Sequence, residues 1–100
     1  MLPSPAALVR EFHRAFGLDA RATPTEVPRR LAAHRQELLD EEVGEVAEAS
    51  REGALDHLAH ELADVVYVAY GTALVHGIDL FRLFRLMGGC SGPTEYSGVR

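Results

Sequence analysis

The sequence predicts an all-α protein: an antiparallel helical hairpin with flanking helices, of the four-helix-bundle type and completed by oligomerisation. Two observations predict this class. Apolar side chains recur at spacings of three and four residues over long stretches, whereas no stretch alternates apolar and polar side chains for long, as a half-buried strand would. Glycine and proline divide the periodic stretches into four segments.

The first predicted helix begins at Pro5. Ser4 supplies a capping hydroxyl, and proline is a preferred residue at the first helical position. Apolar residues follow at helical spacing as far as Phe16, and Gly17 is expected to end the helix. Residues 18–27 lack this periodicity and are predicted to form a loop.

The two central helices are predicted over residues 28–52 and 54–76. Gly53 and Gly77 are their expected stops. Because only a very short turn at Gly53 joins these helices, we expect them to lie antiparallel as neighbours.

A short fourth helix is predicted from Asp79, an N-cap candidate, to about Met87. The composition then changes to glycine, serine and proline, which is typical of a loop. We therefore expect one helical domain over residues 1–87 and a Gly-rich tail over 88–100, forming a loop or disordered.

The composition restricts the partners. The chain of 100 residues has a net charge of −5 and contains no lysine, so it lacks the basic footprint of a nucleic-acid-binding protein. Affinity for a polyphosphate would have to come through bound cations or a local arginine cluster. Because 47% of so short a chain is hydrophobic, we expect a homodimer or a higher homo-oligomer.

The location expected from the sequence is cytoplasmic. Met1 to Arg10 lacks the basic start and apolar run of a signal peptide. The longest uncharged stretch, Val65 to Val75, is too short to span a bilayer, which takes about 20 residues. Cys90 is the only cysteine, which excludes an intramolecular disulfide and is consistent with a reducing compartment.

Two glutamates of the second predicted helix lie within its apolar stripe. Successive residues of an α-helix are rotated by about 100°, so Glu42 falls at about 20° from Leu31 and Glu45 at about 320°. Glu41, at about 280°, lies at the edge of the stripe.

The third predicted helix repeats this pattern. With Leu58 at zero, Glu61 falls at about 300°, between Val65 at about 340° and Val68 at about 280°. Asp64 falls at about 240°, beside Val68. Each helix thus carries two acids three residues apart, on one face about a turn from each other.

These two acidic pairs can converge on the hairpin. Buried carboxylates that lack partners are costly, and a group of like charges is worse unless a cation compensates them. A ligand set made only of oxygen suits Mg²⁺, with Mn²⁺ possible. Glutamates on helix surfaces are more often simply solvated. A di-iron bundle is disfavoured, because no Glu-x-x-His pair is present.

Three further side chains are candidates near this site. Arg35 lies close to Glu42 by helical angle, where it could bind phosphate or pair with an acid. Tyr67 could stack on a base or simply pack in the core or an interface. His57 precedes Glu61 by one helical turn and is in position to hydrogen-bond it.

The two acidic motifs resemble those of a known family. Glu41-Glu42-Val43-Gly44-Glu45 and Glu61-Leu62-Ala63-Asp64 are similar to the E-E-x-x-E and E-x-x-D motifs of the all-α, MazG-like nucleoside triphosphate pyrophosphohydrolases. Dimeric dUTPases and phosphoribosyl-ATP pyrophosphohydrolase are relatives of these enzymes. The resemblance covers roughly residues 30–80 and includes the Gly77-Ile78-Asp79 turn.

The resemblance implies an enzyme and assigns its residues. It implies Mg²⁺ held by Glu42, Glu45, Glu61 and Asp64, the four acids that the helical wheel selects. It also implies that Glu41 assists a further ion or the attacking water, and that a nucleoside or deoxynucleoside triphosphate is hydrolysed to the monophosphate and pyrophosphate.

The tail departs from the pattern of the family. Close relatives carry a histidine, an asparagine and a phosphate-binding lysine after the Gly-Ile-Asp turn, whereas residues 87–93 contain neither asparagine nor lysine. This departure leaves a second function open: a metal- or nucleotide-binding or regulatory module that keeps the scaffold and has lost turnover.

Overall fold

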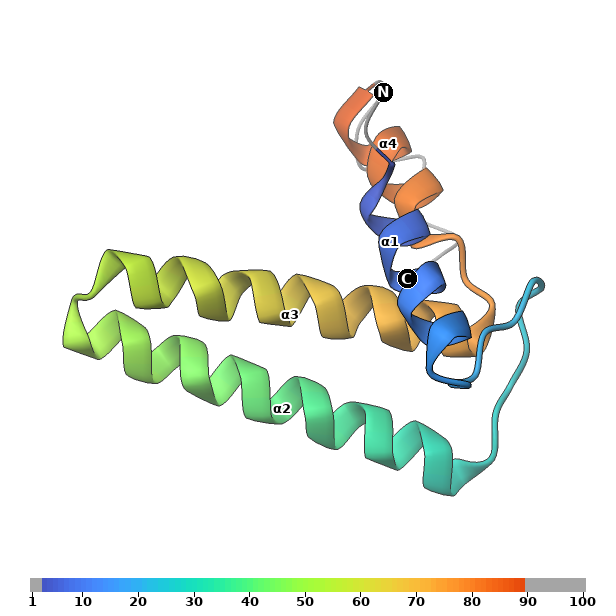
Figure 1. The fold of residues 1–100 in the computed structure, drawn as a ribbon, viewed down its shortest axis with the longest axis horizontal. Coiled ribbons are helices and arrows are strands. Elements are labelled where there is room, and N and C mark those ends of the chain that lie inside the picture. The colour runs from blue at the N-terminus through green and yellow to red at the C-terminus, as the bar shows by residue number, and fades with distance from the viewer. Residues whose placement is uncertain (1–2, 90–100) are drawn as a thin grey trace.

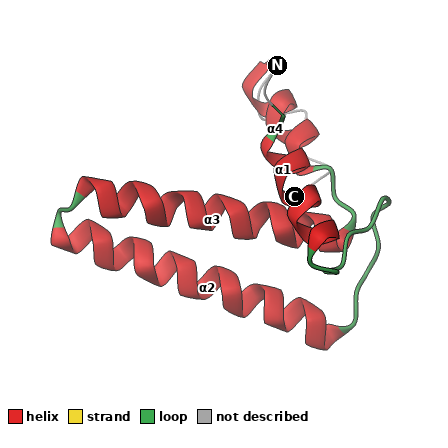
Figure 2. Ribbon diagram, in the orientation of Figure 1, coloured by secondary structure: helices red, strands yellow, loops and turns green. Residues whose placement is uncertain are grey.

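The computed structural model describes residues 3–89 and consists, over that range, of four α-helices and their connections (Figure 1). The helices are α1 (Pro5–Ala15), α2 (Arg29–Glu52), α3 (Leu55–His76) and α4 (Leu80–Gly89). No strand occurs among the described residues (Figure 2). The predicted all-α class and the antiparallel hairpin are confirmed.

The residues predicted to begin and end the helices do so. The Ser4 side chain accepts a hydrogen bond from the backbone N–H of Ala7 at 3.1 Å, and Asp79 Oδ1 accepts one from that of Arg82 at 3.0 Å. Gly53 and Gly77 follow α2 and α3 with φ angles of 74° and 73°, in the left-handed conformation that glycine adopts without steric cost.

The hairpin and the two short helices pack at one end only. The long helices α2 and α3 lie side by side from the Gly53 turn and diverge toward the N-terminal end of α2, and α1 and α4 rise from the C-terminal end of α3 (Figure 1). Val9 of α1 packs there against Tyr70 and Leu74 of α3, with Leu80 and Phe81 at the margin. The end of the hairpin near Gly53 is therefore left without covering helices.

The loop before α2 closes the C-terminal end of α3. The backbone N–H groups of Arg21 and Thr25 donate to the carbonyls of Leu74 and His76 at 2.9 and 2.8 Å. The Arg21 guanidinium donates to the carbonyl of Val75 at 2.7 Å. These bonds satisfy carbonyls that the helix itself leaves without partners.

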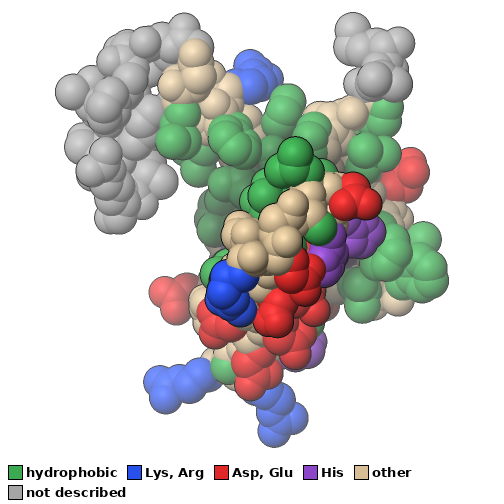
Figure 3. Space-filling model, turned by 90° about the vertical axis from the view of Figure 1, so that its left-hand side faces the viewer, with side chains coloured by type: hydrophobic (Ala, Val, Ile, Leu, Met, Phe, Trp, Pro, Cys, Tyr) green, Lys and Arg blue, Asp and Glu red, His purple; other side chains and the backbone are tan. Residues whose placement is uncertain are grey.

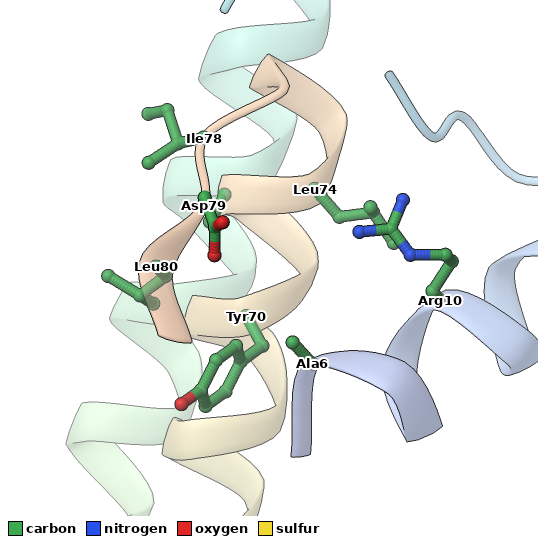
Figure 4. A pocket seen from close by; sticks show the side chains of 8 residues that line it. Ala6, Arg10, Tyr70, Leu74, Ile78, Asp79 and Leu80 are labelled. Carbon is green, nitrogen blue, oxygen red and sulfur yellow. The ribbon is translucent and has the colours of Figure 1, made fainter. Parts of the chain in front are cut away.

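A small hollow lies where α1 meets α3 and the turn into α4 (Figure 4). Tyr70 and Leu74 form its floor, and Arg10 and Asp79 lie on opposite sides of it. Its volume of about 20 Å³ is enough for a single water molecule, and polar groups line part of its wall. The hollow opens to the surface at Ile78 and Asp79, which are both exposed.

Two sequence predictions concern the ends of the chain. The fourth helix runs to Gly89, two residues beyond the predicted Met87, so the predicted tail of 88–100 begins inside a helix. The rest of that tail lies outside the described residues. Among residues 3–89, no helix is long and apolar enough to cross a membrane.

Replacing Gly77 should destabilise the protein more than replacing Gly53. Both positions have a positive φ, so alanine at either should cost about 1–2 kcal/mol. A Cβ at Gly77 would also collide with the Thr23 carbonyl, whereas one at Gly53 meets nothing within 4 Å. Denaturant unfolding of Gly77→Ala and Gly53→Ala measures the difference, and equal losses would contradict the close approach of the loop.

Candidate metal centre

The predicted acidic site forms between the two long helices. Glu42 and Glu45 of α2 face Glu61 of α3, and one carboxylate oxygen from each lies within 4.8 Å of the other two. Figure 3, which views the hairpin from its Gly53 end, shows acidic side chains gathered on this face with histidines beside them. The antiparallel pairing of α2 with α3 thus brings together residues that lie far apart in the sequence.

Asp64 lies beside this compact group but outside it. Its charge is close enough to contribute to the raised pKa of Glu42. Its carboxylate turns toward His60, with 3.6 Å between Asp64 Oδ2 and His60 Nε2, and its side chain is 42% exposed. The structure therefore groups three of the four predicted ligands, and the shorter aspartate side chain remains at the margin.

Two oxygens of the group are buried without a hydrogen-bond partner among the described residues. They are Glu42 Oε1 and Glu61 Oε1. A buried carboxylate oxygen without a donor loses its hydration without compensation. Two such oxygens on facing helices, in a donor set made only of carboxylates, fit a hard divalent cation.

The raised pKa of Glu42 also favours a bound cation at this site. Loss of solvation raises the pKa of Glu42 above its usual value, and the adjacent Glu45 raises it further by hydrogen bonding and by charge. The charges of Asp64 and Glu61 add smaller contributions to that pKa. The arrangement thus opposes ionisation of a carboxyl group in the absence of a cation.

An open hollow adjoins the acidic group. Its lining residues share one end of the hairpin and are Glu41, Gly44, Glu45, Glu48, His57 and Glu61. Glu41, the predicted catalytic residue, is exposed on this hollow. A Cβ at Gly44 would have no neighbour within 4 Å, so the helix surface is open at this position.

Arg35 joins α2 to α3 in the part of the hairpin that lies away from Gly53, at the height of Tyr70 and Leu74. Its Nε donates to Thr72 Oγ1 at 3.2 Å and its Nη2 to the Val68 carbonyl at 3.1 Å. A Cβ at Gly71 would lie 2.5 Å from that Nη2, so the glycine makes room for the guanidinium. Burial lowers the pKa of Arg35. The guanidinium of Arg35 donates to a hydroxyl and a carbonyl, not to the acid that the helical wheel allowed.

Tyr67, the other predicted substrate contact, packs against α1. Its ring lies edge-on to Phe12, with 5.6 Å between the centroids, and Phe12 in turn packs against Phe16. The side chain of Tyr67 is nevertheless 40% exposed. The aromatic packing that the sequence allowed is present, and a role in binding a base remains a prediction.

Two residues at this site were not evident from helical spacing alone. His57 contacts both Glu52 and Glu61, each at 3.1 Å, although only the contact to Glu61 follows from helical spacing. The contact to Glu52 crosses the turn between the helices, which no periodicity encodes. Glu48 lines the hollow as well, although it falls outside the apolar stripe of α2.

Four helices, with a group of carboxylates on the long hairpin, fit the class of the all-α, MazG-like nucleoside triphosphate pyrophosphohydrolases. Within this class, the model of the phosphoribosyl-ATP pyrophosphohydrolase family matches residues 9–87, from α1 into α4. The chain belongs to this family.

A viral relative shows a similar sequence. "Uncharacterized protein L479" of Acanthamoeba polyphaga mimivirus is 36% identical over 81 residues. The match covers 72% of this chain but 30% of that protein. The chain therefore spans less than a third of the length of this relative.

Removing the charge of Glu42 should stabilise the protein in the absence of metal. Because the pKa of Glu42 is raised in the folded state, its ionised form opposes folding at neutral pH. Glu42→Gln should therefore raise the melting temperature in chelator and reduce the stabilisation gained on adding Mg²⁺. Thermal unfolding with and without Mg²⁺ measures both effects.

The matched control is Glu37→Gln, the same change on an exposed position of α2. The stability gap between Glu42→Gln and the wild type in chelator should shrink as the pH falls through the raised pKa of Glu42, because the wild-type carboxyl then takes up its proton. A lower melting temperature for Glu42→Gln in chelator would contradict the electrostatic description.

Proposed function

We propose that this protein is a Mg²⁺-dependent pyrophosphohydrolase that converts a nucleoside or deoxynucleoside triphosphate to the monophosphate and pyrophosphate. Membership of the family supports the reaction class. The observation that carries the proposal is the pair of buried oxygens without partners, Glu42 Oε1 and Glu61 Oε1, on facing helices. Such oxygens are placed to bind a cation that the substrate also needs.

The carboxylates that would hold Mg²⁺ are Glu42, Glu45 and Glu61, joined by Asp64 after rotation of its exposed side chain. Bound Mg²⁺ shields phosphate charge, lowers the pKa of bound water and orients the leaving group. Without cations, the acidic group and the net charge of −5 would repel a triphosphate.

The proposed reaction is a balanced hydrolysis. The oxygen of water forms a bond to the α-phosphorus, the bond from that phosphorus to the oxygen bridging the β-phosphate breaks, and pyrophosphate leaves. We propose Glu41 as the acceptor of the proton of water, and its exposure on the hollow next to the acidic group supports this role.

The substrate class follows from the family and the site. The name of the family points to phosphoribosyl-ATP, which is itself a nucleoside triphosphate. Tyr67 offers a half-exposed ring for a base. We propose that Arg35, in the interior of the hairpin, binds a phosphate of the substrate. To do so, its guanidinium would leave its contacts with Thr72 and Val68.

We also propose that the protein functions as a homodimer. Only six apolar side chains are buried among the described residues, and the described part of the chain exposes many large ones. Leu55, Leu62 and Val66 form a stripe on α3 at spacings of seven and four residues, and they are 78, 49 and 47% exposed. This stripe lies toward the end of α3 that α1 and α4 leave uncovered, and a second copy of the chain would bury it.

Turnover should depend on the acidic group. The purified protein with Mg²⁺ should release pyrophosphate rather than orthophosphate from a panel of nucleoside triphosphates that includes phosphoribosyl-ATP, and chelator should abolish this release. Glu45→Ala and Asp64→Ala should each lower kcat/KM by about 100-fold or more, since metal stabilisation of the transition state amounts to several kcal/mol.

Glu37→Ala on the exposed face of α2 is the matched control and should leave kcat/KM unchanged. Circular dichroism checks that each variant keeps its helices. If no nucleotide of the panel yields pyrophosphate with Mg²⁺ or Mn²⁺, the enzyme is ruled out and the function is that of a binding or regulatory module.

Self-association should depend on the α3 stripe. Sedimentation at micromolar concentration should give at least twice the chain mass of 10.9 kDa. Leu62→Glu and Val66→Glu should shift the protein toward monomer, because each would bury a charge in the interface. Leu18→Glu, at an exposed apolar residue of the loop, is the control. A wild-type monomer would contradict the proposal.

A further inference from the structure

His57 connects two carboxylates across the turn between the long helices. Its Nδ1 lies 3.1 Å from Oε1 of Glu52, the last residue of α2, and its Nε2 lies 3.1 Å from Oε2 of Glu61 on α3. Carboxylate oxygens accept hydrogen bonds, so the ring donates in both contacts as the imidazolium; the hydrogen bond to Glu52 raises the pKa of His57 and favours this form. His57 also lines the hollow beside the acidic group.

The contact with His57 occupies one of the two oxygens of Glu61. The Glu61 side chain is only 10% exposed. Its Oε2 is held by His57, whereas its Oε1 is buried without a hydrogen-bond partner. A carboxylate that is held at one oxygen and open at the other has a defined orientation.

The same helix contains an internal comparison. His60 precedes Asp64 by four residues, as His57 precedes Glu61, but the distance from His60 Nε2 to Asp64 Oδ2 is 3.6 Å. His60 is 73% exposed, and this distance is too long for a hydrogen bond. Asp64 is also the acid that lies outside the compact group. The acid with the close imidazole is the one that faces the glutamates of α2.

We propose that His57 is a positioning residue of the metal centre, whose hydrogen bond turns Glu61 toward Glu42 and Glu45 while Glu52 fixes the imidazole ring. This inference rests on the proposed function, because it assumes that the acidic group binds a divalent cation. Groups that orient metal-binding side chains affect metal affinity without touching the ion.

The test is the affinity of the nucleotide-free protein for Mn²⁺, measured from the paramagnetic resonance signal of free Mn²⁺. His57→Leu should weaken Mn²⁺ binding by about 10–100-fold. His57→Gln should recover part of this loss, because its amide N–H can donate to Glu61. His60→Leu, the matched control one turn along the helix, should bind Mn²⁺ as the wild type does.

Glu52→Leu tests the role of His57 without changing His57 itself. Glu52 is 53% exposed, so its replacement should leave the fold intact while the ring loses its anchor, and Mn²⁺ binding should weaken less than in His57→Leu. Thermal unfolding in chelator checks the fold of each variant. If His57→Leu does not fold, Glu52→Leu and His57→Gln decide the question.

The outcomes separate the two proposals. A wild-type protein that binds no Mn²⁺ removes the metal centre and the proposed function with it. A wild-type protein that binds Mn²⁺, together with folded His57→Leu and Glu52→Leu variants of equal affinity, overturns the role of His57 alone. Loss of affinity in His57→Leu without recovery in His57→Gln also overturns that role, because the donor would then not matter.

Discussion

The rest of the structure depends on the close approach of carboxylates from α2 and α3. Like charges within 4.8 Å of one another repel, and the raised pKa of Glu42 reflects both that repulsion and the loss of solvation. Because these carboxylates repel one another, the contacts that stabilise the hairpin must come from other residues. The apolar core provides them, since Val9, Tyr70 and Leu74 pack at the opposite end of the hairpin, where α1 and α4 cover α3.

At the height of the core, the two long helices are joined by a polar contact. Arg35 reaches from α2 to the Thr72 hydroxyl and to a carbonyl of α3, and Gly71 provides the space for its guanidinium. Each of these contacts fixes the separation of the helices at one height along the hairpin. The position of Glu42 relative to Glu61 therefore depends on residues that lie well away from either glutamate.

The match to the family model covers both the helices that stabilise the hairpin and the residues of the acidic site. The family model spans α1 to α4, so the match includes the helices that hold the hairpin as well as the hairpin itself. The acids of the two motifs lie at least six residues along the chain from the core contacts of α3, where α1 and α4 leave the hairpin open. The scaffold thus places its stabilising residues and its candidate functional residues at different ends of the same two helices.

The sequence by itself determined the four helices, their capping residues and the antiparallel hairpin, because helical period and the chemistry of Ser4, Gly53, Gly77 and Asp79 are local properties. It also selected the acids of the site, because a carboxylate within an apolar stripe is visible in the spacing alone. Tertiary structure decided what spacing does not encode: that Asp64 turns aside, that His57 reaches Glu52 across the turn, and that Arg35 contacts α3 instead of an acid. Each of these depends on the distance and rotation between two helices, which a single helix does not contain.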